Sequence, residues 1–189
     1  LQAGQKIAVI GEMAKAPRFQ GAGSSVINPT MLSNAYDELV GLGVDVTYAQ
    51  GYYKSAGSKK EQKTRMSEAE LTAEAVKAAK NANVAVVFVG LTEDYEGEGY
   101  DRETINMPPN HNKLVSDVAA ANPNTVVVLA GGSVVLMPWL GEVKALLNSG
   151  LGGQAGGAAV ANLLTGKVNP SGKTSETYPT SFEVNPTFG

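Results

Sequence analysis

Residues 91–102 carry a high density of carboxylates for so short a stretch. Gly97 and Gly99 separate these acids, so they cannot share one face of a helix. The residues before them, 84–90, form an apolar run that is typical of a buried strand. We therefore expect a loop that presents acidic side chains at the end of a strand, on the kind of rigid scaffold where sites are built. The acids are Glu93, Asp94, Glu96, Glu98 and Asp101, with Arg102 among them and Glu103 just beyond.

General acid chemistry on glycosides is one candidate for this loop. It needs one carboxyl group that is protonated at the working pH and a second that is ionised. Crowding by like charges raises a carboxyl pKa, and partial burial raises it further. Asp94, Glu96 and Glu98 could provide this crowding, whereas Arg102 would oppose it. A solvated acidic loop without chemistry explains the same composition, and the residues alone leave both interpretations open.

Calcium binding is a second candidate, and the spacing argues against it. Asp94, Glu96, Glu98 and Gly99 partly follow the EF-hand pattern, but Ile105 stands where the last glutamate should be. The glutamates in the middle of the pattern are also longer than the usual ligands. We expect no calcium site of this type.

Other metal and cofactor sites lack their ligands. His111 is the only histidine and the chain has no cysteine, which excludes sites built from several histidines or thiolates. His111 follows Pro109 and is expected in the first turn of a helix. The glycines at 21–23 and 150–157 fit neither a dinucleotide fingerprint nor a Walker sequence. We interpret the first as a flexible turn and the second as allowing close packing of a helix on a sheet, and expect no cofactor.

Apolar runs alternate with helical patterns along most of the chain. Ser67 and Glu70 match a capping box, and Asn28 with Pro29 resembles a helix start. The near-continuous apolar runs indicate parallel strands covered on both faces. We predict an α/β fold, a three-layer sandwich with a mostly parallel sheet of about five or six strands, to which residues 169–179 could add an edge strand. The predicted strands lie at 6–11, 44–51, 84–89, 124–130 and 143–147.

Topology places the acidic loop before any chemistry is considered. In parallel sheets of this kind, ligands bind beyond the carboxyl ends of the strands. The loops after Gly11, Gly51, Gly90 and Gly132 all belong to that edge. The acidic stretch follows Gly90, so we expect it on the ligand-binding edge.

Composition argues against two classes of binding partner, nucleic acids and membranes. The 189 residues carry a net charge of −3 without a long basic run, which argues against nucleic acid. No apolar stretch approaches the ~20 residues that span a bilayer, so a membrane partner is not expected. The first residues are neither an initiator methionine nor a signal peptide. We expect a piece of a longer protein, whose location stays open with a cytoplasmic one favoured.

At the acidic loop the sequence resembles glycoside hydrolase family 3, the β-glucosidase-type enzymes, in their C-terminal (α/β)6 sandwich domain. The resemblance implies a sandwich over residues 1–180 and an irregular tail, 181–189, leading towards a missing domain. Its markers span nearly the whole chain in the family's order. They are KIAVIG at 6–11, QGAGSS at 20–25, GLTEDYEGEGYDR at 90–102 with Met107 and Pro108, Pro138 with Trp139, GGQAGG at 152–157 and GKVNPSGK at 166–173.

The resemblance also implies roles. Glu98, just before the Gly-Tyr-Asp-Arg segment, matches the family's acid/base glutamate, with Glu96 as the runner-up and as a substrate-binding residue. The substrate implied is a β-glucoside or oligosaccharide. The nucleophile of these retaining enzymes is an aspartate on a (β/α)8 barrel of about 250 residues, more than this chain has. We therefore expect the isolated chain to be inactive, because it can provide only one of the two carboxyls.

Two other functions stay open. A doubly wound fold could serve as a non-catalytic module that binds a sugar or a nucleotide at the same edge. It could also be a structural partner whose exposed apolar patch covers a barrel.

Overall fold

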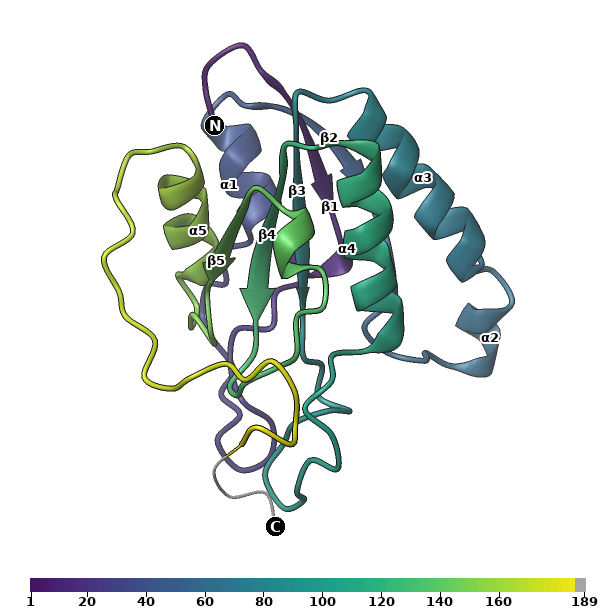
Figure 1. Cartoon of the computed structure of the whole chain (residues 1–189), viewed down its shortest axis with the longest axis vertical. Coiled ribbons are helices and arrows are strands. Elements are labelled where there is room, and N and C mark those ends of the chain that lie inside the picture. Colours follow the sequence, from purple (N-terminus) through teal and green to yellow (C-terminus); the bar gives the residue numbers. More distant parts are fainter. Residues whose placement is uncertain (186–189) are drawn as a thin grey trace.

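A computed structural model describes residues 1–185 of the chain. Its centre is a five-stranded sheet in which every pair of neighbouring strands is parallel. Figure 1 shows the strands with helices on both faces, which confirms the predicted α/β sandwich. The strands lie in the order β2 (Asp45–Ala49), β1 (Lys6–Ile10), β3 (Val84–Gly90), β4 (Thr125–Ala130) and β5 (Ala145–Asn148).

The helices form two pairs. α1 (Ala35–Gly41) packs against α5 (Gly156–Leu164), and α3 (Glu68–Lys80) packs against α4 (Pro109–Ala121). Right-handed crossovers put the two pairs on opposite faces of the sheet. A short α2 (Lys59–Gln62) and the 3₁₀ turns η1 (Glu12–Ala14) and η2 (Leu140–Glu142) complete the elements.

Apolar burial explains why the middle strands hold the fold together. All residues of β3 after Val84 are buried, as are all residues of β1 after Lys6. Helices α3 and α4 contribute an apolar stripe with helical spacing, including Leu71, Ala75 and Leu114. The sheet is therefore a rigid platform whose carboxyl-end loops can be held in fixed positions.

Two of the predicted helix starts had different outcomes. The capping box at Ser67 is confirmed, because Ser67 and Glu70 exchange side-chain to backbone hydrogen bonds. The start at Asn28 and Pro29 is wrong: α1 begins later, with Asn34 accepting from the Asp37 N–H. Met31 is 77% exposed, so the apolar residues before Asn34 do not belong to a buried helical face.

The C-terminal segment lies against the body without joining the sheet. The edge strand expected at residues 169–179 is not formed, and Tyr178 is attached by a side-chain bond in which Asn148 Nδ2 donates to its hydroxyl at 2.8 Å. Pro170 and Pro179 lack the backbone donors that a ladder needs. Of the expected tail at 181–189, residues 181–185 contain no helix or strand and residues 186–189 lie outside the described part. Among the described helices, none combines the length and apolar character needed to cross a bilayer.

Candidate functional site

The acidic loop leaves the sheet at the carboxyl end of β3, as predicted. Figure 1 shows it at the lower end of the molecule, where the loops after β1 and β4 also lie. Gly90 makes this exit possible, because a Cβ atom there would stand 1.7 Å from the carbonyl oxygen of Ala130. Beyond it, the Thr92 carbonyl accepts from the N–H groups of Tyr95 and Glu96 at 3.0 and 3.2 Å. This turn fixes the position of the backbone from which the side chains of Glu96 and Glu98 extend.

Glu96 is anchored by protein donors. Its Oε1 accepts from the Gly132 N–H at 2.7 Å, and its Oε2 accepts from the Ser133 hydroxyl at 2.9 Å. Arg18 Nη2 lies 3.9 Å from Oε1 and also donates to the Glu96 carbonyl at 3.2 Å. Only 13% of the Glu96 side chain is exposed. Glu96 therefore ties together the loops that follow β1, β3 and β4.

Arg102 does not oppose the acids in the way expected. Its Nη1 donates to the Ser133 hydroxyl at 2.8 Å and to the Val134 carbonyl at 2.7 Å. It therefore reaches the same serine as Glu96 and braces the loop after β4. Within the described residues it forms no ion pair with Glu98.

Glu98 has a different environment from Glu96. Its side chain is exposed, and its Oε2 accepts from the Ser24 N–H at 2.6 Å and from the Ser24 hydroxyl. The backbone bonds in the same place, because the Glu98 N–H donates to the Ala22 carbonyl at 3.3 Å. The second carboxylate oxygen, Oε1, has no hydrogen-bond partner among the described residues.

The electrostatic expectation for Glu98 is wrong in direction. The hydroxyl and then the N–H of Ser24 hold the pKa of Glu98 below its usual range, because both stabilise the ionised form. The carboxylates of Glu96 and Glu98 are held by different segments, Glu96 by Gly132 and Ser133 and Glu98 by Ser24, and no neighbouring acid is among the causes of the Glu98 pKa shift. Crowding inferred from sequence spacing therefore does not describe this loop.

A polar hollow lies beside the loop, at the point where the strand order reverses between β1 and β3. It has a volume of about 270 Å³, and such switch points are where open α/β sheets bind ligands. Its walls come from the loops after β1, β2 and β3. Lining residues include Glu12, Arg18, Gln20, Lys54 and Asp94.

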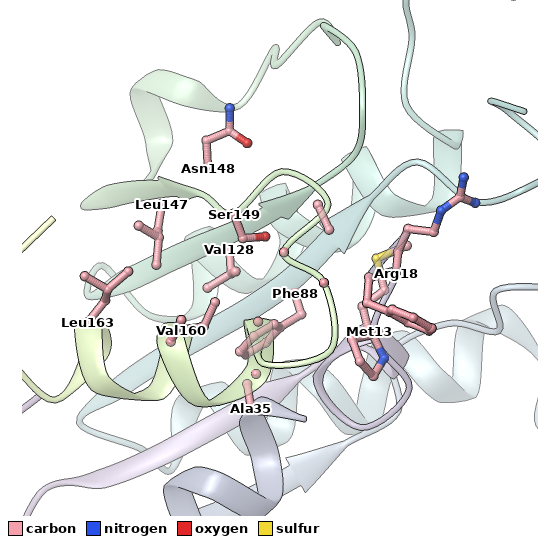
Figure 2. A pocket seen from close by; sticks show the side chains of 18 residues that line it. Met13, Arg18, Ala35, Phe88, Val128, Leu147, Asn148, Ser149, Val160 and Leu163 are labelled. Atoms are coloured by element: carbon pink, nitrogen blue, oxygen red, sulfur yellow. The ribbon is translucent and has the colours of Figure 1, made fainter. Parts of the chain in front are cut away.

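A second hollow, shown in Figure 2, is apolar and lies between α5 and the sheet. Val160 and Leu163 of α5 face Val128 and Leu147 of the strands across about 210 Å³. The glycines at 152–157 do allow close packing as expected, but the nearest approach is to α1 rather than to the sheet. A Cβ atom on Gly157 would stand 2.5 Å from the Asn34 Cα.

His111 has a structural position. It lies in the first turn of α4, as predicted, and its Nδ1 is 3.0 Å from the Gly90 carbonyl oxygen. Burial lowers the pKa of His111 to about 4, so the ring is neutral at pH 7. Its ring contacts that of Tyr52, with centroids 3.8 Å apart and the ring planes tilted by 46°. In the described part of the chain, no three His, Asp or Glu side chains are grouped as metal ligands.

The sequence analysis did not identify three residues that bind the acidic loop: Arg18, Ser24 and Ser133. Each acts on the acidic loop from another part of the chain, between 31 and 78 residues away. Residues 21–25 were interpreted as a flexible turn, although Gly23 is followed by two serines that could donate hydrogen bonds. That pair was the only sequence signal for the bond to Glu98.

Comparison with known proteins covers almost the whole chain. The model of the "Glycosyl hydrolase family 3 C-terminal domain" matches residues 1–188. Thermostable beta-glucosidase B of Acetivibrio thermocellus is 46% identical over 185 residues, which are 96% of this chain and 23% of that protein. Exo-alpha-(1->6)-L-arabinopyranosidase of Bifidobacterium longum is 43% identical over 97% of this chain and 23% of its own length.

Solved structures of β-glucosidases also resemble this chain. The GH3 beta-glucosidase of Bifidobacterium adolescentis superimposes with a TM-score of 0.86 at 46% identity, over 96% of this chain and 26% of that one. A beta-glucosidase from Kluyveromyces marxianus in complex with glucose gives a TM-score of 0.90 at 21% identity, over 100% of this chain and 40% of that one, a likeness of fold alone. The chain spans about a quarter of the curated relatives named above. It belongs to glycosyl hydrolase family 3, as the C-terminal domain of β-glucosidase-type enzymes.

Proposed function

We propose that this chain supplies the acid/base carboxylate, Glu98, to a retaining glycoside hydrolase of β-glucosidase type. The observation that carries the proposal is the position of Glu98 on the carboxyl-edge loop. Its side chain is exposed, one carboxylate oxygen is bound by Ser24, and the other is free to meet a substrate. Glu96, the runner-up, has both oxygens engaged by the protein and is much less accessible.

Glu98 would act twice in the reaction. First it gives its proton to the glycosidic oxygen as the bond from that oxygen to C1 breaks, and the bonding electrons stay on the departing oxygen. An aspartate oxygen from a barrel domain forms the new bond to C1. In the second step a water transfers a proton to Glu98 while its oxygen attacks C1, and the aspartate is released.

A partner domain is needed to keep Glu98 protonated as well as to supply the second carboxyl group. The lowered pKa of Glu98 suits a base, whereas a general acid must hold its proton near the working pH. A barrel that covers the loop would take Glu98 out of water and bring an aspartate to about 5 Å from it, and both changes raise a carboxyl pKa. We infer that docking converts Glu98 from an exposed carboxylate into an acid.

Exposed apolar side chains near Glu98 support such a covering partner. Val26, Ile27 and Tyr100 are 52%, 60% and 49% exposed, and the first two follow the turn that binds Glu98. The relatives are roughly four times as long as the chain, which leaves ample length for a (β/α)8 barrel. We propose residues 1–180 as the sandwich domain and the tail after it as the connection towards that partner.

We also propose that Glu96 binds the substrate, by accepting a hydrogen bond from a sugar hydroxyl. A carboxylate has about four acceptor positions, and Gly132 and Ser133 use two of them. A sugar hydroxyl that reaches Glu96 would take a third. This role would add to its part in fixing the loop.

The names of two relatives suggest two different substrates for the complete enzyme. A β-glucoside or oligosaccharide is the proposed substrate, since several of the similar proteins are named beta-glucosidases. An α-L-arabinopyranoside is the alternative, because the Bifidobacterium longum relative is almost as similar. Turnover of aryl β-glucoside and aryl α-L-arabinopyranoside by the complete enzyme would separate them.

The leaving-group dependence of Glu98→Gln in the complete enzyme tests the acid role. For a substrate whose leaving group needs protonation, kcat/KM should fall by about 10²–10⁴-fold. For a dinitrophenyl glycoside, which leaves without a proton, the loss in the glycosylation step should stay under about tenfold. Glu103→Gln, which changes an exposed acid just beyond the loop, is the matched control and should change neither.

Two results would contradict this function. An equal loss on both substrates would remove Glu98 from the acid role. Turnover of either aryl glycoside by the purified 189-residue chain would contradict the need for a second domain.

A further inference from the structure

The turn formed by Ala22, Gly23 and Ser24 encloses one side of Glu98. Ser24 gives two donors, its N–H at 2.6 Å and its hydroxyl, to the same oxygen, Oε2. The Glu98 N–H donates to the Ala22 carbonyl at 3.3 Å, so backbone and side chain are both fixed by this turn. No other donor to the carboxylate is present among residues 1–185. An exposed glutamate is thus held in one orientation by a segment 74 residues away in sequence.

Gly23 is required for this close approach. Its φ is +91°, a conformation that other residues adopt only with strain. A Cβ atom there would lie 2.5 Å from the Glu98 Cβ and 2.8 Å from its Oε2. The turn is therefore shaped around the glutamate.

We propose that Ser24 is the positioning residue of Glu98 and that it selects Oε1 as the oxygen that carries the catalytic proton. This rests on the acid/base role proposed for Glu98. The Ser24 N–H can only donate, so it keeps Oε2 an acceptor in both protonation states, and the Ser24 hydroxyl adds a second donor when the group is ionised. The proton is then favoured on Oε1, the oxygen without a hydrogen-bond partner among the described residues.

Ser24 also biases the charge of Glu98. Two donors on one oxygen favour the carboxylate over the acid, and they are the main causes of its lowered pKa. The turn itself, residues 21–25, carries no charge. The charged neighbours on the acidic loop are Glu96, Asp101 and Arg102, of which the first and last bind Ser133 instead. A substitution of Ser24 is therefore the change that should shift the pKa of Glu98.

The first experiment is a ¹³C NMR titration of the Glu98 carboxyl group in the 189-residue chain. Ser24→Ala keeps the N–H and removes the hydroxyl, so the pKa of Glu98 should rise towards that of an unperturbed glutamate. Ser24→Thr retains a hydroxyl and should restore the lowered value. Ser25→Ala, an exposed serine next in sequence, is the matched control and should leave the titration unchanged. An unchanged pKa in Ser24→Ala, or an equal rise in Ser25→Ala, overturns the inference.

The second experiment uses the complete enzyme and separates positioning from simple stability. In Ser24→Ala the alkaline limb of kcat/KM should move to higher pH, the same direction as the shift found by NMR, because Glu98 keeps its proton to a higher pH. kcat should fall by roughly 10-fold to 100-fold while KM changes little, since a misplaced carboxyl group costs rate more than binding. An unmoved limb overturns the inference.

The two proposals fail separately. No NMR shift in Ser24→Ala, together with the predicted leaving-group pattern in Glu98→Gln, removes only the role of Ser24. An NMR shift together with an equal loss on both substrates in Glu98→Gln removes the acid/base role, and the catalytic meaning of Ser24 with it.

Discussion

Glu96 and Glu98 are separated by one glycine and have opposite surroundings. Glu96 is 13% exposed and is bound by Gly132, Ser133 and Arg18, so it fixes three loops to one another. Glu98 is exposed and is bound only by Ser24 among the described residues. A buried carboxylate with several donors stabilises a loop, whereas an exposed one with a free oxygen is available for proton transfer. We therefore propose that the acidic loop contains an anchor, Glu96, and a group that takes part in the reaction, Glu98.

The largest stability effect should come from the anchor. Glu96→Ala removes two hydrogen-bond acceptors and leaves the Arg18 guanidinium, whose side chain is 5% exposed, without its carboxylate. The free energy of unfolding should fall by about 3 kcal/mol, the usual cost of breaking such a partly buried charged network. Urea denaturation of the 189-residue chain would measure it.

Glu103→Ala is the matched control for that comparison. It removes an exposed acid just beyond the same loop and should change the free energy of unfolding by less than about 0.5 kcal/mol. If Glu96→Ala and Glu103→Ala were equally stable, Glu96 would not be an anchor and the contrast with Glu98 would fail.

A smaller effect is expected from the titration of Glu98. Its pKa is lower in the folded chain than in the unfolded one, because of the Ser24 bonds. The stabilisation is therefore present above the unfolded glutamate pKa of about 4.3 and is lost as the pH falls through the folded value. Glu98→Gln should lose less stability than the unmodified chain between pH 5 and pH 3, by denaturation at each pH.

Other glutamates titrate in the same range, and a comparison of the two proteins removes their contribution. Glu61 and Glu70 also have lowered pKa values, which arise from Ser58 and Ser67 in their capping boxes. They are present in both proteins, so the difference between the two pH profiles isolates Glu98. Parallel profiles would show that Ser24 does not stabilise the Glu98 carboxylate in solution.

Local patterns predicted the scaffold well. The apolar runs gave the five parallel strands, and the capping box at Ser67 gave the start of α3, because such signals depend on neighbouring residues. The start of α1 was misplaced because Asn28 with Pro29 and Asn34 are similar signals, and only burial distinguishes them.

The site was predicted less completely, for a physical reason. The acidic loop and its edge of the sheet follow from topology, whereas Glu98 as the acid/base rests on the family resemblance and stays a prediction. The bonds that give Glu96 and Glu98 their separate surroundings come from Arg18, Ser24 and Ser133, each remote in sequence. Since a pKa depends on distances in space, sequence crowding predicted the wrong direction for Glu98.

Rescue of Glu98→Ala by azide in the complete enzyme tests the central claim most directly. Azide attacks the glycosyl-enzyme without a general base, so it should restore turnover of a dinitrophenyl glycoside and yield a glycosyl azide of retained configuration. Glu96→Ala, which keeps the acid/base group, should gain nothing from azide and form no such product. A glycosyl azide from Glu96→Ala but not from Glu98→Ala would contradict the assignment of Glu98 as the acid/base and Glu96 as the anchor.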